Sequence, residues 1–265
     1  MGIFRKWWNH YRWCQLKTIS EKIEFLNLTD DPDLASRVAC TDEEVEVRIA
    51  AVRMVNDAEV LRRLIERDPN LNVRLTAVNC VKCDSILLCA ALSNSLRKVK
   101  LEAATHISNI DLLTKLVRET DSEEISKLAI LKIFDTNVLI ELSRIHGEWI
   151  LKRIINGDFP HNAKMDAIDG ISDQKLLQDI VNTNELENVD LNLRACERIS
   201  CQRILWQIAR NHQYNNVRLS AVRRLEDQEI LADVALKDAH AKIRYIAISK
   251  LKNESDLAAV IRVEK

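Results

Sequence analysis

The sequence Val73-Arg-Leu-Thr-Ala-Val-Asn-Cys-Val81 is one copy of a phrase that recurs along the 265-residue chain. Its eight copies start, in order, at Val47, Val73, Val99, Ile125, Ala163, Leu191, Val217 and Ile243. The fifth position of every copy is alanine and the fifteenth is leucine, as Ala77 and Leu87 are in this one. Two residue types that stay fixed through eight copies indicate a repeat protein rather than a globule with a single core.

Each copy predicts two short helices. Positions 1, 5, 6 and 9 are apolar at helical spacing, and positions 15, 18 and 19 are apolar again. An aspartate often stands at position 11, where its side chain can accept a backbone N–H bond and start the second helix; these residues are Asp57, Asp135, Asp173 and Asp227. Helices of about ten residues do not persist alone, so each copy must stack on the next. We therefore expect an all-α fold, a right-handed α-solenoid of about nine helix pairs.

The repeat is interrupted once. Most copies are 26 residues apart, but the step from Ile125 to Ala163 is 38, and the extra residues fall near 143–162. Glu148 to Ile155 within them is expected to form an added helix. The insertion is either a working surface or a repeat that has lost its register. The expected segments are a capping helix at 1–18, front repeats at 19–145, the insertion at 146–162 and rear repeats at 163–265.

The N-terminal segment 1–18 has its own composition. Phe4, Trp7, Trp8 and Tyr11 are spaced so that they share one face of a helix, and the segment has four basic residues and no acids. One interpretation is a cap that covers the open end of the first repeat. The alternative is a helix that lies on a membrane surface, with its aromatic rings inserted between lipids.

Composition narrows the classes of function. The 39 basic and 40 acidic residues nearly cancel, which argues against a nucleic-acid partner. Seven cysteines, an odd number without a framework spacing, favour a reducing, cytoplasmic location. We recognise neither a bilayer-spanning run nor a secretory signal.

Position 2 of the phrase is usually basic. The residues are Arg48, Arg74, Lys100, Arg218 and Arg244, with Lys164 as a sixth. Acids close the preceding copies, as Asp68 does before Arg74 and Asp238 before Arg244. We expect a ladder of ion pairs between successive copies, although contact with a ligand is the alternative.

The phrase Val-Arg-x-x-Ala-Val-x-x-Leu, followed by aspartate and a second leucine-rich helix, resembles the HEAT-repeat family in its short bacterial form. The resemblance covers about residues 20–265. It implies the stacked fold but says little about function, because members include scaffolds, bilin lyases, metal-dependent hydroxylases and DNA glycosylases. The hydroxylases use adjacent His-Glu pairs as ligands, and the nearest approach here is His146-Gly147-Glu148.

Candidate chemistry is sparse. Cys80-x2-Cys83 with Cys89 resembles half of a zinc site, but a fourth ligand is missing nearby, and cysteines are common core residues. We find no glycine-rich phosphate loop and no nucleophile in a recognisable setting. The sequence therefore predicts no catalytic residue, no metal and no cofactor.

The candidate binding surface is the second helix of each copy. In HEAT-type stacks these helices line the concave side, and their positions 16 and 20 are expected to point outward. The residues selected on this basis are Arg118, Arg144, Trp206, Arg210, Leu88 and Ile140. Arginine beside exposed apolar residues is typical of protein-binding surfaces, although a solvated face with scattered arginines is the alternative.

The expected function is a non-catalytic scaffold that binds a protein or peptide in this groove. The first alternative is a nucleic-acid-binding protein of the alkylpurine DNA glycosylase type, which needs a basic wall with aromatic residues. The second is a bilin lyase-like chaperone, which rests on the fold alone.

Overall fold

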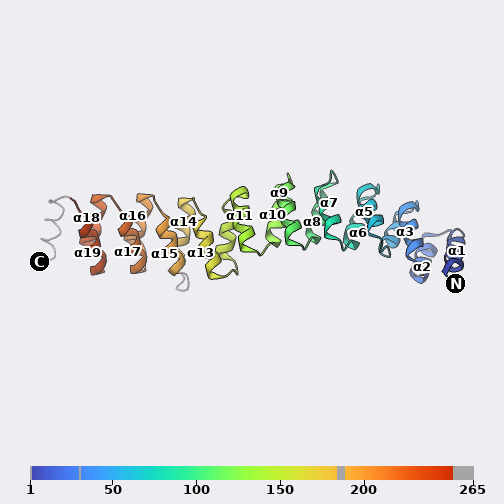
Figure 1. Cartoon of the computed structure of the whole chain (residues 1–265), viewed down its shortest axis with the longest axis horizontal. Coiled ribbons are helices and arrows are strands. Elements are labelled where there is room, and N and C mark those ends of the chain that lie inside the picture. Colours follow the sequence, from blue (N-terminus) through green and yellow to red (C-terminus); the bar gives the residue numbers. More distant parts are fainter. Residues whose placement is uncertain (1, 30, 184–188, 253–265) are drawn as a thin grey trace. The chain divides into compact units, whose positions relative to one another are not determined.

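The computed structural model describes residues 2–29, 31–183 and 189–252, with side chains from Trp8 onward. These ranges form nineteen helices and contain no strand (Figure 1). The all-α prediction is therefore confirmed for the described residues. The chain divides into two compact units, residues 1–134 and 135–265. The boundary lies ahead of the expected insertion at 146–162.

Unit 1 is a two-layer stack of helices. Along one layer α4, α6, α8 and α10 pack in succession, and along the other α3, α5, α7 and α9 do the same. We call these the first and second layers. The bounds are α1 Gly2–Trp13, α2 Ile19–Thr29, α3 Pro32–Thr41, α4 Val45–Val52, α5 Ala58–Arg67, α6 Leu71–Cys80, α7 Asp84–Leu92, α8 Arg97–His106, α9 Ile110–Glu119 and α10 Glu123–Lys132.

Unit 2 repeats this arrangement. Its first layer is α13, α15, α17 and α19, and α16 packs against α18 in the second layer. Helix α14 belongs to the second layer too, and side-chain hydrogen bonds join it to α16 and the residue after it. The bounds are α11 Thr136–His146, α12 Trp149–Asn156, α13 His161–Asp169, α14 Gln174–Val181, α15 Val189–Arg198, α16 Gln202–Asn211, α17 Asn215–Arg224, α18 Gln228–Lys237 and α19 Ala241–Lys250. The added helix expected at 148–155 is present as α12, which packs against both α11 and α13. The second helix of the last copy, with Leu257, falls outside the described residues.

The closest packing joins copies rather than the two helices of one copy. The second helix of a copy lies against the first helix of the next, as α5 does on α6 and α16 on α17, except at α11, where α12 packs between them. Each copy therefore depends on its neighbour for burial of its apolar face, as the short helices require.

The constant residues of the phrase form the core. All eight alanines at position 5, from Ala51 to Ala247, are completely buried. The described leucines at position 15 are buried too, with Leu61 the most accessible at 3 % exposed. Alanine allows the helices to approach closely at this position, and the close packing then leaves no space for a larger side chain.

Aspartate starts the second helices as expected. The Asp57 carboxylate accepts hydrogen bonds from the backbone N–H groups of Glu59 and Val60. The other three predicted caps, Asp135, Asp173 and Asp227, also accept such bonds. These bonds satisfy donors that the first turn of a helix leaves free.

A second set of caps connects successive copies of unit 2. Gln174 Oε1 accepts from the backbone N–H of Ser200 at 2.7 Å, one copy further along. Gln202 does the same for Glu226 at 2.9 Å, and Gln228 for Lys252 at 2.7 Å. Each glutamine is the first residue of a second-layer helix, so the start of one helix is tied to the loop of the next copy.

The basic residues at position 2 form ion pairs within their own copy and bond to backbone carbonyls that precede it. Arg48 pairs with the carboxylate of Asp68 at 3.0 Å, and both residues are buried. The same arginine donates to the backbone carbonyls of Asp42 and Glu43, which precede its own helix. The expected carboxylate partner was different, because Asp68 stands just before Arg74; the fold instead brings it beside the arginine twenty residues earlier. Arg74 donates to the carbonyl of Ile65.

Asp238 shows the ladder most completely. Its carboxylate accepts from Arg218 at 3.0 Å, and its backbone carbonyl accepts from Arg244 of the next copy. Burial alone would raise the pKa of Asp238, but the bonds from Arg218 and from the His240 N–H outweigh burial and lower it. One acid therefore joins two successive arginines.

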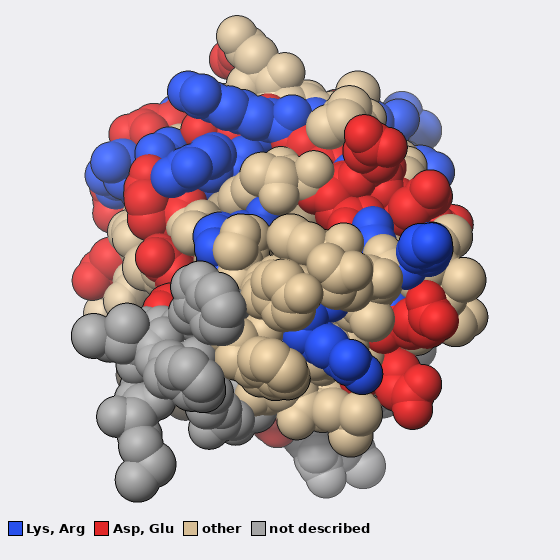
Figure 2. Space-filling view, turned by 90° about the vertical axis from the view of Figure 1, so that its right-hand side faces the viewer, with Lys and Arg blue, Asp and Glu red and all other residues tan. Residues whose placement is uncertain are grey.

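The N-terminal helix α1 packs on unit 1 by one side. Asn9 Nδ2 donates to Asp31 Oδ2 at 2.9 Å within a buried contact, and the Trp13 ring lies 6.4 Å from that of Phe25. On the other side Trp8 and Tyr11 are about half exposed. Figure 2 views this end, where uncharged residues occupy the middle of the surface and charged residues lie around them. The side chains of Phe4 and Trp7 fall outside the described residues.

No helix within the described ranges could cross a bilayer. The longest of them, α1, has 12 residues, whereas a span needs about 20.

Candidate functional site

The second-layer helix α16 carries two of the residues selected from the sequence. Trp206 and Arg210 are four residues apart and therefore lie on the same face of the helix. The guanidinium carbon of Arg210 lies 5.7 Å from the centroid of the Trp206 ring. This is a cation–π contact, in which the positive charge faces the electron-rich ring. Trp206 is half-buried and Arg210 is exposed, so the pair presents a broad amphipathic surface.

A polar cavity of about 590 Å³ lies between α14 and α16. Five side-chain amides line it, together with one histidine and one isoleucine. We call it the amide pocket; its residues are Gln178, Asn182, Gln207, Ile208, Asn211, His212 and Gln213. Gln178 Nε2 donates to Gln207 Oε1 at 2.7 Å and so links the two helices. None of the described residues that line the pocket has a charged side chain.

His212 fixes one wall of the amide pocket. The residue is buried, and its Nδ1 accepts from the backbone N–H of Tyr214 at 3.2 Å. Because Nδ1 accepts, the ring proton lies on Nε2, which donates to the carbonyl of Val181 at 2.8 Å. The imidazole thus ties the end of α16 to the end of α14 and has no ring nitrogen left for a ligand.

On the opposite side of α16 the surface is charged but balanced. A small cavity of about 70 Å³ between α16 and α18 is lined by Arg210 and Lys237 and by Asp233 and Asp238. Lys237 forms a close ion pair with Asp233 on its own helix. This surface presents no excess of positive charge to a phosphate backbone.

The remaining candidates do not join this cluster. Arg118, at the end of α9 in unit 1, and Arg144, on α11 in unit 2, are both exposed, and they belong to different units. Ile140, also on α11, is half-buried.

The selection of Leu88 as a surface residue was wrong. Leu88 is 5 % exposed and belongs to the core of unit 1. Helix α7 has the same kinds of neighbours as the other second-layer helices, namely α5, α8 and α9, so its own sequence accounts for the burial. Its sequence, Asp-Ser-Ile-Leu-Leu-Cys-Ala-Ala-Leu, is correspondingly apolar on most sides.

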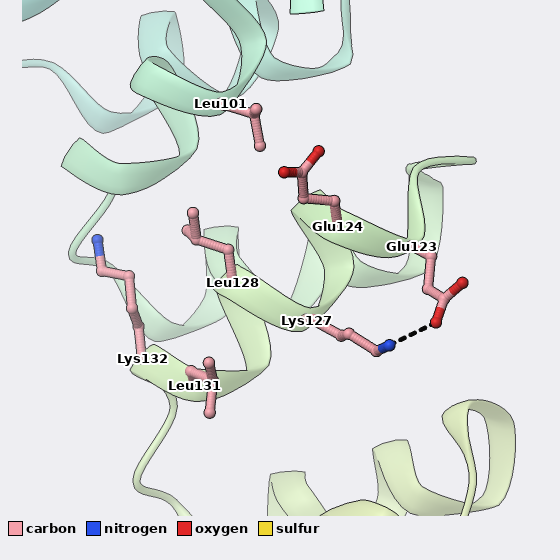
Figure 3. Close-up of a pocket in the computed structure, with 7 residues that line it drawn as sticks. All are labelled: Leu101, Glu123, Glu124, Lys127, Leu128, Leu131 and Lys132. Atoms are coloured by element: carbon pink, nitrogen blue, oxygen red, sulfur yellow. Dashed lines mark ion pairs between the residues drawn. The ribbon is translucent and has the colours of Figure 1, made fainter. Parts of the chain in front are cut away.

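A larger cavity of about 880 Å³ opens between α8 and α10 of unit 1 (Figure 3). Its apolar part comes from Leu101, Leu128 and Leu131, and charged residues surround them. Two of these charges are paired, because Lys127 Nζ lies 2.5 Å from Glu123 Oε1. The leucines stand at positions 3, 4 and 7 of their copies, where the phrase has no constant apolar residue. The groove has apolar area but few directed polar groups, so it does not specify a ligand.

The described residues offer little to a metal. No group of three His, Cys, Asp or Glu side chains within them could hold an ion. Cys83 is exposed at the start of α7, whereas Cys80 is half-buried at the end of α6.

Comparison of the chain with protein-family models and with curated proteins found no match.

The sequence analysis does not predict the amide pocket. Its signal is a pair of amides four residues apart on each of two successive second-layer helices, Gln178 with Asn182 and Gln207 with Asn211. Gln178 and Asn182 do stand at positions 16 and 20, but the prediction relied on arginine and large apolar residues there, and Gln207 and Asn211 stand at positions 17 and 21.

Proposed function

We propose that the chain is a non-catalytic scaffold that binds a protein or peptide on the second-layer face of unit 2, formed by α14, α16 and α18. The observation that carries this proposal is the Trp206–Arg210 contact at the surface of α16, the helix that also lines the amide pocket. Tryptophan and arginine are the residues most enriched where binding energy concentrates in protein interfaces. A pre-stacked pair loses little side-chain freedom when a partner covers it.

Three broader proposals accompany this function. The repeats form a HEAT-like stack, its superhelix is right-handed with about nine helix pairs, and the protein works in the cytoplasm. The first two rest on the phrase and on the two-layer packing within each unit. The third rests on the odd, scattered cysteines.

The test uses Trp206→Ala and Arg210→Glu, with Arg223→Glu as a matched control. Arg223 is exposed on α17, in the other layer of unit 2. Proteins that bind to the immobilised wild-type chain are purified, and their affinity for the wild type and for each variant is measured by titration. We expect the two α16 variants to lose about tenfold or more in affinity, as hot-spot residues do, and the control to bind as the wild type does. Unchanged affinity in both α16 variants would contradict the proposal, as would salt-dependent binding to duplex DNA in place of protein.

A further inference from the structure

We infer that the amide pocket reads the main chain of an extended peptide. This inference rests on the proposed function and names the part of the partner that the second-layer face recognises. The amide pocket, and not the Trp206–Arg210 pair, then recognises the backbone groups of the partner.

The chemistry of the pocket fits a peptide backbone. Each asparagine or glutamine presents an N–H donor and a carbonyl acceptor side by side. A peptide main chain offers the complementary groups, one N–H and one C=O for each residue. Among the described residues that line the pocket only His212 is ionisable, and its two nitrogens are already bonded, so these residues offer no opposite charge to a charged ligand group.

The spacing of the amides fits an extended chain. Four residues of α-helix advance about 6 Å along the axis, which separates Gln178 from Asn182 and Gln207 from Asn211. Two residues of a β-strand advance about 6.6–6.8 Å, and every second residue directs its N–H and C=O to the same side. A strand that runs along α14 and α16 therefore meets one amide of each helix at every second residue.

The amides are available for this contact. Gln178 and Gln207 use one donor and one acceptor in their mutual bond, which leaves each side chain a further N–H and C=O. Asn182, Asn211 and Gln213 are exposed, and their side chains make no hydrogen bond to the described parts of the chain. The cavity volume of about 590 Å³ lies within the usual range for ligand sites, about 300–1,000 Å³.

The pocket is also held in shape before binding. His212 ties the ends of its two helices together, and Ile208, which is buried, lies beneath the amides. Trp206 and Arg210 each precede a pocket amide, Gln207 or Asn211, by one residue on α16, so a bound segment that extends beyond the pocket can contact them. Main-chain affinity and side-chain selectivity then come from adjacent parts of one helix, as in other modes of strand recognition.

The test starts from a library of random linear 12-residue peptides selected on the intact protein. Selected peptides are synthesised and titrated by fluorescence anisotropy against wild type, against Gln178→Ala/Asn182→Ala and against Gln207→Ala/Asn211→Ala. Asn162→Ala is the control, because this amide is exposed on α13, outside the pocket. Each double variant is expected to bind about tenfold more weakly or worse, since two side chains that bond to the peptide are removed. The control variant is expected to bind as the wild type does.

Main-chain recognition has a separate readout. Peptides methylated at alternate backbone nitrogens lack the N–H donors at those residues. We expect the wild-type protein to bind them about tenfold more weakly than the unmethylated peptides. The double variants should show little of this loss in affinity, because the side chains that would accept the bonds are already absent. An equal loss in wild type and variants would overturn the inference, as would failure to select any peptide. Peptides that respond to Trp206→Ala but not to the amide variants would refute this inference and leave the proposed function standing. Circular dichroism of each variant verifies that the helices are intact.

Discussion

At the residue scale, the position-5 alanines set how closely the helices approach. Ala77 is completely buried in α6, which packs against α4, α5 and α8. We expect Ala77→Leu to lower the free energy of unfolding by about 1–3 kcal/mol, because extra methylenes force neighbouring side chains out of their rotamers. Urea unfolding measures the loss. Ala58→Leu is the matched control, since Ala58 is exposed at the start of α5, and a similar loss in both variants would contradict the packing argument.

The buried ion pairs and the surface ion pairs should behave differently. Arg48 and Asp68 are both at least nine-tenths buried, so Arg48→Ala leaves a carboxylate without its charge partner and two carbonyls without a donor. We expect a loss of about 3–5 kcal/mol in the free energy of unfolding. Arg62 pairs with Glu59 and Glu66 on the exposed side of α5, and Arg62→Ala should change stability little, because water screens such pairs. Chemical denaturation of the two variants makes the comparison, and equal losses would be the contrary result.

The same scale shows what the sequence could predict. The Asp57 cap follows from a local rule, since donor and acceptor lie two or three residues apart. The partner of Asp68 does not, because Arg48 and Arg74 are both basic position-2 residues and packing alone decides between them. Leu88 was misplaced for a related reason: a helix that is apolar on most sides gives no periodic signal for its exposed face. The surface position of Trp206 and Arg210 could be predicted because the buried face of their helix is clear, with a fully buried Leu205 beside them.

At the element scale, α1 shows both features that segment 1–18 suggested. Its packing on α2 and α3 supports the cap, and the exposed rings of Trp8 and Tyr11 leave the membrane alternative a surface to act through. We expect deletion of residues 1–18 to lower the melting temperature of the protein, because the buried Asp31 loses the Asn9 bond and Phe25 loses the Trp13 ring. An unchanged melting temperature, together with loss of liposome binding, would favour the membrane instead.

The glutamine caps show how an element acquires its place in the stack. Gln174, Gln202 and Gln228 open successive second-layer helices, and each reaches a loop one copy further along. Their spacing of 28 and then 26 residues equals the local repeat distance, so the pattern was visible in the sequence. Its meaning was not, because a glutamine at a helix start normally serves its own first turn.

At the scale of the whole molecule, the apolar side chains of each unit are buried by neighbouring helices of the same unit, so each unit should be stable without the other. We expect fragments 1–134 and 135–265 to fold alone, since a repeat stack derives its stability from nearest-neighbour contacts and each unit is compact by itself. Circular dichroism and thermal unfolding of each purified fragment check this expectation, with helical signal and a cooperative transition as the expected result. A cut between α5 and α6 is the control, because it divides two helices that pack closely and should leave both products less stable. If neither fragment 1–134 nor fragment 135–265 folds while the intact chain does, the two units are not independently stable.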